Sequence, residues 1–245
     1  MLKILFIFLS LAPFLFAAES VTIPTMNFNL AAPDSPQQLV SSLNVLVVLT
    51  LLFLAPSMVL VMTTFTRFVI VFGFLRQALG TQQVPPTQLL VMLAMILTFF
   101  VMEPVGTKAY NVGIKPYLAQ EIGYEEAFTK TALPFKSFMI RNTREKDLAL
   151  FFRIRKMENP QTIDDVPLSI IIPAFVISEM KTAFEIGFLI FLPFLVIDMV
   201  VASILMSMGM MMLPPVMISL PFKILVFVLI DGWNLLIGNL IASIK

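Results

Sequence analysis

Four long hydrophobic segments limit what this 245-residue chain can fold into more than any other feature of its sequence. They cover approximately residues 43–65, 87–105, 170–208 and 217–244. A helix needs about 20 apolar residues to cross the hydrocarbon core of a bilayer. The composition agrees, since 59% of the residues are hydrophobic, only 13% are charged and the mean hydropathy is +0.96. Because a segment in lipid must satisfy its own backbone hydrogen bonds, we expect an all-α membrane protein.

The third and fourth segments are too long for one simple span each. Pro173, Gly187 and Pro193 interrupt the third segment, and Asp231-Gly232 interrupts the fourth. Such interruptions favour bent helices and helical hairpins that pack against other protein. The sequence therefore predicts a first hydrophobic helix pair over 42–107 and a second hydrophobic hairpin region over 168–245.

The N-terminus has the pattern of a signal peptide over residues 1–18. Lys3 supplies a short positive region, residues 4–16 are apolar but too short to span a bilayer, and Ala17-Ala18 precedes polar sequence. The alternative is a short membrane anchor that stays attached. Residues 19–41 are then expected to be an extracytoplasmic linker without regular structure, because they contain several prolines.

The charges between the first two hydrophobic segments predict the orientation. Arg67 and Arg76 lie there, and residues 66–86 contain no acidic residue. By the positive-inside rule both charges are expected on the cytoplasmic side, which places residues 108–167 outside the cytoplasm.

The polar insert at 108–167 is expected to be a small helical module. Pro134 suits the first turn of a helix, and Asn142-Thr143-Arg144-Glu145 resembles a capping box at the start of a second helix. The phenylalanines of the insert would supply an apolar face for docking or oligomerisation. A solvated lid without a partner is the alternative.

Charged residues inside the third and fourth segments are the candidate functional residues, because a charge at membrane depth needs a partner or water. Lys181 and Glu185 are spaced to pair within one helix. Glu179 and Lys223 come from different segments and are candidates for an ion pair between helices or between subunits. The further charges expected to be buried are Lys181, Glu185, Asp198 and Asp231.

Asp198 shares one helical stripe with Phe184, Phe188, Phe191 and Leu195, which implies a protein neighbour rather than lipid. Structural pairing is the plainer interpretation of these charges, and a proton or ion relay is the alternative. An intramembrane aspartyl protease is disfavoured, since neither Asp198 nor Asp231 has the glycine-flanked context of such sites and two carboxylates would have to share a proton.

Six methionines lie within residues 206–217 beside Gly209 and Pro214-Pro215. Flexible Met side chains suit a deformable apolar plug in a symmetric ring. A Met-rich core turn and a Cu(I) thioether site are the alternatives.

The chain has no Cys, no His and a net charge of +1, so most catalytic and metal chemistries lack their usual residues and nothing favours nucleic acid. We expect no enzyme activity, no cofactor and no metal site.

Several motifs together resemble the FliP family of flagellar type III export-gate proteins and its injectisome counterparts. The similarity covers approximately residues 42–245. The matching runs are 64–68, 85–88, 172–188 (IPAFVISEMKTAFEIGF), 192–201, 207–215 (SMGMMMLPP), 220–223 and 231–233.

The resemblance implies a subunit of a helical, homopentameric ring in the bacterial inner membrane and flagellar basal body. It implies FliQ, FliR, FlhB and FlhA homologues as partners, and unfolded flagellar subunits as the passengers of a pore. It also implies that Met210, Met211 and Met212 form the pore constriction and that Glu179 and Lys223 form the ion pair between subunits. A small-solute or Cu(I) membrane transporter is the leading alternative, and a membrane enzyme is the third.

Overall fold

A computed structural model describes residues 36–81, 83–157, 162, 166–210 and 213–244. Every regular element of these residues is a helix, as expected from the composition. The chain divides after Leu49 into two units. The expected signal peptide at 1–18 and most of the expected linker lie outside the described residues.

The described part of the first unit is the beginning of α2 (Pro36–Val61). The helix starts at Pro36, inside the segment expected to be an irregular linker. Proline is tolerated at the first helical position because a backbone N–H there would have no hydrogen-bond acceptor within the helix. Val40, Leu43 and Leu46 are each more than half exposed in this unit, as lipid-facing side chains would be.

The second unit contains the end of α2 and all further helices. Their bounds are α3 (Phe65–Ala78), α4 (Thr87–Ala109), the π-helical turn η2 (Tyr110–Ile114), α5 (Lys115–Leu118), α6 (Tyr124–Asn142), α7 (Glu145–Arg155), α8 (Leu168–Ser207), α9 (Pro215–Leu229) and α10 (Gly232–Ala242).

The four hydrophobic segments correspond to stretches that are long and apolar enough to cross a membrane. Three are the helical stretches Leu43–Val61, Thr87–Leu118 and Leu168–Ser207. The fourth is formed by α9 and α10 together, which are bent by 65° at the break between them. The expected interruption at Asp231-Gly232 is therefore confirmed, and Asp231 has a left-handed φ of 52° at the bend.

The expected interruptions of the third segment are wrong. α8 is one helix of 40 residues that continues through Pro173, Gly187 and Pro193. A proline inside a helix loses one N–H and frees one carbonyl, and packed neighbours can compensate for this in a membrane helix.

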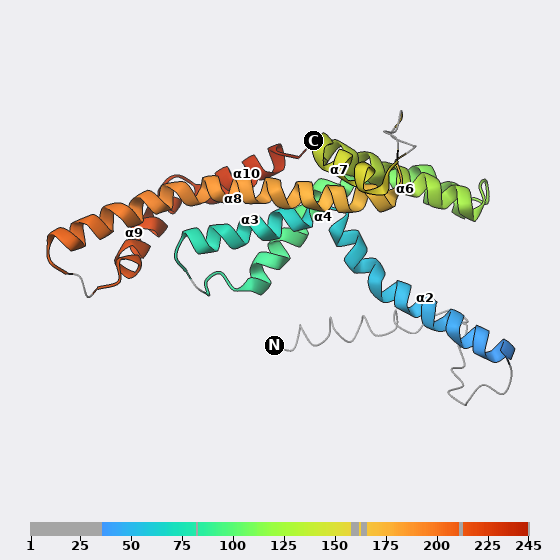
Figure 1. Ribbon diagram of the computed structural model, residues 1–245, viewed down its shortest axis with the longest axis horizontal. Coiled ribbons are helices and arrows are strands. Elements are labelled where there is room, and N and C mark those ends of the chain that lie inside the picture. The colour runs from blue at the N-terminus through green and yellow to red at the C-terminus, as the bar shows by residue number, and fades with distance from the viewer. Residues whose placement is uncertain (1–35, 82, 158–161, 163–165, 211–212, 245) are drawn as a thin grey trace, which may run out of the picture. The chain divides into compact units, whose positions relative to one another are not determined.

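α3 packs along α8, and the two helices run in the same direction (Figure 1). The buried stripe of α3 consists of Phe68, Val71, Phe72 and Leu75. Burying one such side chain contributes about 1.5–3 kcal/mol. Gly187 of α8 permits the close approach, since the side chain of Phe74 occupies the space that a Cβ would need.

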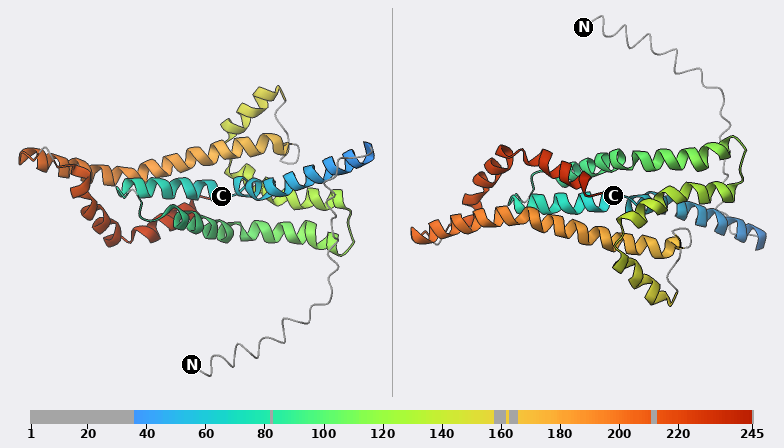
Figure 2. Two further views of the ribbon diagram at one scale, coloured as in Figure 1. Left: turned by 90° about the horizontal axis from the view of Figure 1, so that it is seen from below. Right: turned by 90° about the horizontal axis from the view of Figure 1, so that it is seen from above.

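The helical insert is confirmed, with two differences. Pro134 lies inside α6 rather than in its first turn. α7 begins at Glu145, but no side chain caps its first turn. Asn142 and Thr143 instead donate hydrogen bonds back to the carbonyls of the preceding helix. α6 and α7 pack near the beginning of α8, whereas α9 folds back from its far end (Figure 2).

Candidate functional site

The first polar cluster joins α3, α8 and the end of the chain. The Arg67 guanidinium donates from Nε to Oε2 of Glu179 at 2.7 Å, and from Nη2 to Oε1 of the same carboxylate. Its Nη1 donates to the Ser243 carbonyl at 3.0 Å and to Ser243 Oγ at 2.8 Å. The Arg67 and Glu179 side chains are only 2% and 1% exposed. Both charges are thus desolvated, and the planar guanidinium fork satisfies the carboxylate at two points.

The second polar cluster joins α3, α8 and α9. Lys223 Nζ donates to Asp198 Oδ2 at 2.6 Å and to the Ala78 carbonyl at 3.2 Å. Ser219 Oγ donates to Asp198 Oδ1 at 2.5 Å. Because Ala78 is the last residue of α3, the ammonium also interacts favourably with the negative end of that helix dipole.

These clusters give Glu179 and Lys223 different partners from those expected. Within one chain the two side chains do not pair with each other, because Glu179 is held by Arg67 and Lys223 by Asp198. A contact between chains stays a prediction. The expected protein neighbour of Asp198 is present, and it is α9.

A third cluster ties the insert to α8. Ser178 Oγ donates to Asp147 Oδ2 at 2.6 Å and accepts from the Arg144 backbone N–H at 3.0 Å. Arg144 Nε donates to the same Asp147 oxygen at 2.8 Å. Burial works to raise the pKa of Asp147, but the hydrogen bonds from Ser178 and Arg144 and the Arg144 charge outweigh it, so this pKa lies below its ordinary value.

The remaining charges expected to be buried are exposed in the single chain. Lys181 and Glu185 form the expected pair at 3.1 Å, but their side chains are 42% and 59% exposed. Asp231 is exposed at the bend before α10. Of the four further charges that were expected to be buried, which are Lys181, Glu185, Asp198 and Asp231, only Asp198 belongs to one of the polar clusters described above.

Arg67 and Arg76 do not lie in a loop, as the orientation argument assumed, but in α3. Arg76 donates to Thr87 Oγ1 at 2.9 Å on the surface, which fits a boundary charge. Arg67 is a buried pairing residue, and sequence reasoning missed this role. Its position offered a signal: Arg67 shares one helical stripe with Val71, Leu75 and Ala78, which are all buried.

The methionine-rich segment forms the turn between α8 and α9. Gly209 has a positive φ of 73° at the end of α8, which suits the reversal of the chain. Met206, Met208, Met210 and Met217 are all exposed. These four side chains are not part of a core within the single chain. Met211 and Met212 lie outside the described residues.

In the part of the chain that the structure describes, no three His, Cys, Asp or Glu side chains are grouped as they would be around a metal ion. The polar clusters instead link helices to one another. In the first and second clusters the charged side chains pair with one another, which is the arrangement that an apolar environment demands.

Long apolar helices tied together by desolvated ion pairs define this chain as a helical membrane protein. The FliP family profile matches residues 48–240. The chain is 52% identical over 215 residues to the flagellar biosynthetic protein FliP of Bacillus subtilis (strain 168), covering 88% of this chain and 97% of that protein. The Caulobacter vibrioides FliP is 54% identical over 197 residues, with 80% and 74% covered. The Pectobacterium carotovorum FliP is 50% identical over 211 residues, with 86% and 82% covered. The chain therefore belongs to the FliP family.

Proposed function

We propose that the chain is a pore-forming subunit of the flagellar type III protein export gate. It passes unfolded flagellar subunits across the bacterial inner membrane, at the base of the flagellum. The observation that carries the proposal is the family match over residues 48–240, together with relatives that are named flagellar biosynthetic proteins. The membrane-spanning length of the described helices supports the location.

The proposed assembly is a homopentamer that binds FliQ, FliR, FlhB and FlhA homologues. Exposed apolar side chains on α8 support it. Phe184, Phe188 and Leu195 are 48%, 61% and 39% exposed and lie on the helical stripe of Asp198. Aromatic side chains are frequent at protein interfaces. A ring of identical chains offers each such stripe a neighbouring helix.

The proposed gate is the turn between α8 and α9, with Met210, Met211 and Met212 from each chain narrowing the pore. An apolar constriction blocks ions by excluding water. Met is suited to this because its unbranched side chain has three rotatable bonds and adapts to a passing chain. The exposure of Met210 in the single chain supports a surface role, since a residue that filled a core would be covered.

Replacement of Met210, Met211 and Met212 by Ala tests the gate. Assembly should persist, and cells that overproduce the complex should leak small ions. The matched control is Met180→Ala with Met199→Ala, since both residues are exposed on α8 away from the turn. Loss of the complex in the triple variant alone would favour a core turn. Altered copper uptake without ion leakage would favour the transporter, and normal export without leakage contradicts the gate.

Processing of the N-terminus is a separate proposal. Cleavage of residues 1–18 should leave a mature protein that begins near Glu19. N-terminal sequencing of the membrane-assembled protein checks this, and recovery of Met1 contradicts it.

A further inference from the structure

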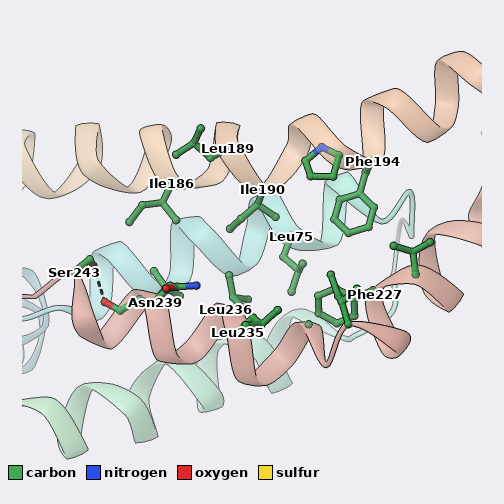
Figure 3. Close-up of a pocket in the computed structure, with 15 residues that line it drawn as sticks. Leu75, Ile186, Leu189, Ile190, Phe194, Phe227, Leu235, Leu236, Asn239 and Ser243 are labelled. Carbon is green, nitrogen blue, oxygen red and sulfur yellow. Dashed lines mark hydrogen bonds between the residues drawn. The ribbon is translucent and has the colours of Figure 1, made fainter.

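An apolar groove lies between α8 and the pair α9 and α10 (Figure 3), and its polar end is already engaged. Asn239 and Ser243 are the two polar residues of its lining. The Ser243 N–H donates to the Asn239 carbonyl at 3.0 Å, and the Ser243 carbonyl accepts from Arg67 at the same distance. Positive charge without a close counter-charge lies instead where α7 packs against α8 (Figure 2).

Two lysines face each other at this junction. Lys146 is in the first turn of α7, and its ammonium lies at hydrogen-bonding distance from that of Lys181 on α8. Ser178 lies one turn before Lys181 on the same helix. It donates to Asp147 Oδ2 and accepts from the Arg144 N–H, so the beginning of α7 is fixed against this turn of α8. The attachment of the insert therefore brings the two ammonium groups together.

The two ammonium groups cannot bond each other while both are charged, because each is a donor and neither is an acceptor. Contact with the Lys181 ammonium lowers the pKa of Lys146 from its ordinary value, and the Arg144 charge adds to this. The Asp147 charge opposes the shift only in part. Either Lys146 gives up its proton, or an anion comes between the two lysines.

The nearby carboxylates are bound to other groups. Asp147 is held by Arg144, and Glu185 pairs with Lys181 at 3.1 Å from the next turn of α8. Lys146 forms no ion pair with any carboxylate of the described residues. Its charge is therefore in excess at the junction.

The guanidinium of Arg144 adds to this excess. Its Nε and Nη2 lie 2.8 Å and 2.5 Å from Asp147 Oδ2, whereas Nη1 is buried and has no acceptor among the described residues. Buried donors without an acceptor are rare in folded proteins. The Arg144 charge is thus only partly compensated, and it contributes to the positive potential around Lys146.

We propose that Lys146 and Lys181 bind a phosphate group between α7 and α8, supplied as free inorganic phosphate or as the headgroup of a phospholipid. The group accepts from both ammonium groups and replaces their repulsion by two charge-assisted hydrogen bonds. It therefore strengthens the attachment of the insert to α8. The proposal does not rest on protein export, since it concerns a binding site of the insert.

The arrangement of the donors favours phosphate among anions. Lysine binds phosphate as a point charge with donors that can rotate. The oxygens of a phosphate group point in different directions, so ammonium groups from two helices can each donate to one of them. A chloride ion has no such oxygens and acts on both lysines mainly by screening their charges.

The test measures how readily Lys146 is acetylated in the full-length protein within its purified complex. Only the neutral amine reacts, and a bound phosphate favours the charged amine, so it should protect Lys146. In detergent, inorganic phosphate should lower this acetylation at least about fivefold relative to sodium chloride at equal ionic strength, as measured by peptide mass spectrometry. Lys156, an exposed lysine at the end of α7, should change by less than about twofold.

Vesicles separate the two sources of the phosphate group. The complex is reconstituted without inorganic phosphate, either in phosphatidylglycerol or in a galactolipid mixed with oleate to the same surface charge. Protection of Lys146 in phosphatidylglycerol alone assigns the site to a lipid headgroup. Protection by inorganic phosphate in detergent, without this difference between the vesicles, assigns it to the free ion.

Lys181→Gln removes one of the two donors and should abolish the effect of phosphate on Lys146. Lys130→Gln is the matched control, since Lys130 forms a surface pair of the same spacing with Glu126, and protection should persist in it. Protection that survives Lys181→Gln overturns the proposal. Equal acetylation of Lys146 with phosphate and with chloride, in detergent and in both kinds of vesicle, overturns it as well and needs no variant.

Discussion

Arg67 of α3 and Glu179 of α8, 112 positions apart in the sequence, form an ion pair at two points with both side chains almost fully removed from solvent. The same guanidinium also binds Ser243 near the end of the chain. At the other end of α3, Lys223 Nζ donates a hydrogen bond to the Ala78 carbonyl. Two ionic clusters therefore fix both ends of α3 against the later helices.

Glu179→Ala should reduce the stability of the folded chain substantially. The substitution leaves the Arg67 charge buried without a counter-charge, which typically costs about 3–5 kcal/mol. We expect a clear fall in the thermal denaturation midpoint of the detergent-solubilised protein. Glu126→Ala is the matched control, because Glu126 pairs with Lys130 on the surface with side chains 55% and 46% exposed. Glu126→Ala should reduce the free energy of unfolding by less than about 1 kcal/mol.

Charge reversal separates pairing within the chain from pairing between chains. Arg67→Glu with Glu179→Arg should recover part of the stability that either single change removes, since the two side chains contact each other directly. Recovery by Glu179→Lys with Lys223→Glu would instead support the contact expected between subunits. If the first pair shows no recovery, the arrangement around Arg67 is wrong.

Lys223→Met should weaken the attachment of α9 to α8 and α3. It removes the donor to Asp198 and to the end of α3, but Asp198 keeps its bond from Ser219 and its side chain is 23% exposed. The loss should therefore be smaller than for Glu179→Ala, on the order of 1–3 kcal/mol. Asp198→Asn keeps the shape and one acceptor but leaves the Lys223 ammonium, whose side chain is 3% exposed, without its counter-charge, so it should cost more than Lys223→Met. Thermal denaturation of the three variants side by side checks this order.

The helical segments were predictable because their hydrophobic runs are long. The breaks were predictable only in part. Asp231-Gly232 bends the chain because Asp231 adopts a left-handed conformation, whereas Pro173 and Pro193 leave α8 continuous. A proline costs a helix one hydrogen bond, and packed neighbours can offset that loss. The sequence alone does not show at which proline the helix continues.

The charged site was predictable as a set of residues but not as a set of pairs. Glu179, Lys223 and Asp198 were identified because charges are costly in apolar segments. Their partners depend on which helices lie side by side: α3, from the first hydrophobic pair, packs along α8, and α9 packs against the later part of α8. Arg67 was treated as a loop charge because its partner is 112 residues away.

The Asp147 carboxylate predicts a pH dependence of stability. Its pKa is lower in the folded chain than in the unfolded chain, so over the interval between the two values the unfolded state binds more protons and stability rises with pH. The contribution is complete above the ordinary aspartate pKa of about 3.9 and is lost as the pH falls through the folded value.

Asp147→Asn should flatten the pH dependence of the denaturation midpoint below about pH 5, where the native carboxylate begins to lose its contribution. Glu145→Gln is the control, because Glu145 is an exposed acidic residue in the first turn of the same helix. A steep fall that survives in Asp147→Asn would assign the pH dependence to other groups.

The close approach of α3 and α8 predicts opposite effects for two Gly→Ala changes. A Cβ on Gly187 would lie 2.5 Å from Phe74 Cδ2 and 2.9 Å from Phe74 Cβ, so the helices would have to separate. Gly187→Ala should thus cost about 1–3 kcal/mol. Gly73 has nothing within 4 Å of the same position, so Gly73→Ala should stabilise α3 by up to about 1 kcal/mol through helix propensity.

Phe74→Ala removes the side chain that blocks a Cβ on Gly187, so Gly187→Ala should cost much less in that background than alone. Thermal denaturation of the single and double variants measures this coupling, and a strictly additive result would mean that Phe74 and Gly187 are not in contact.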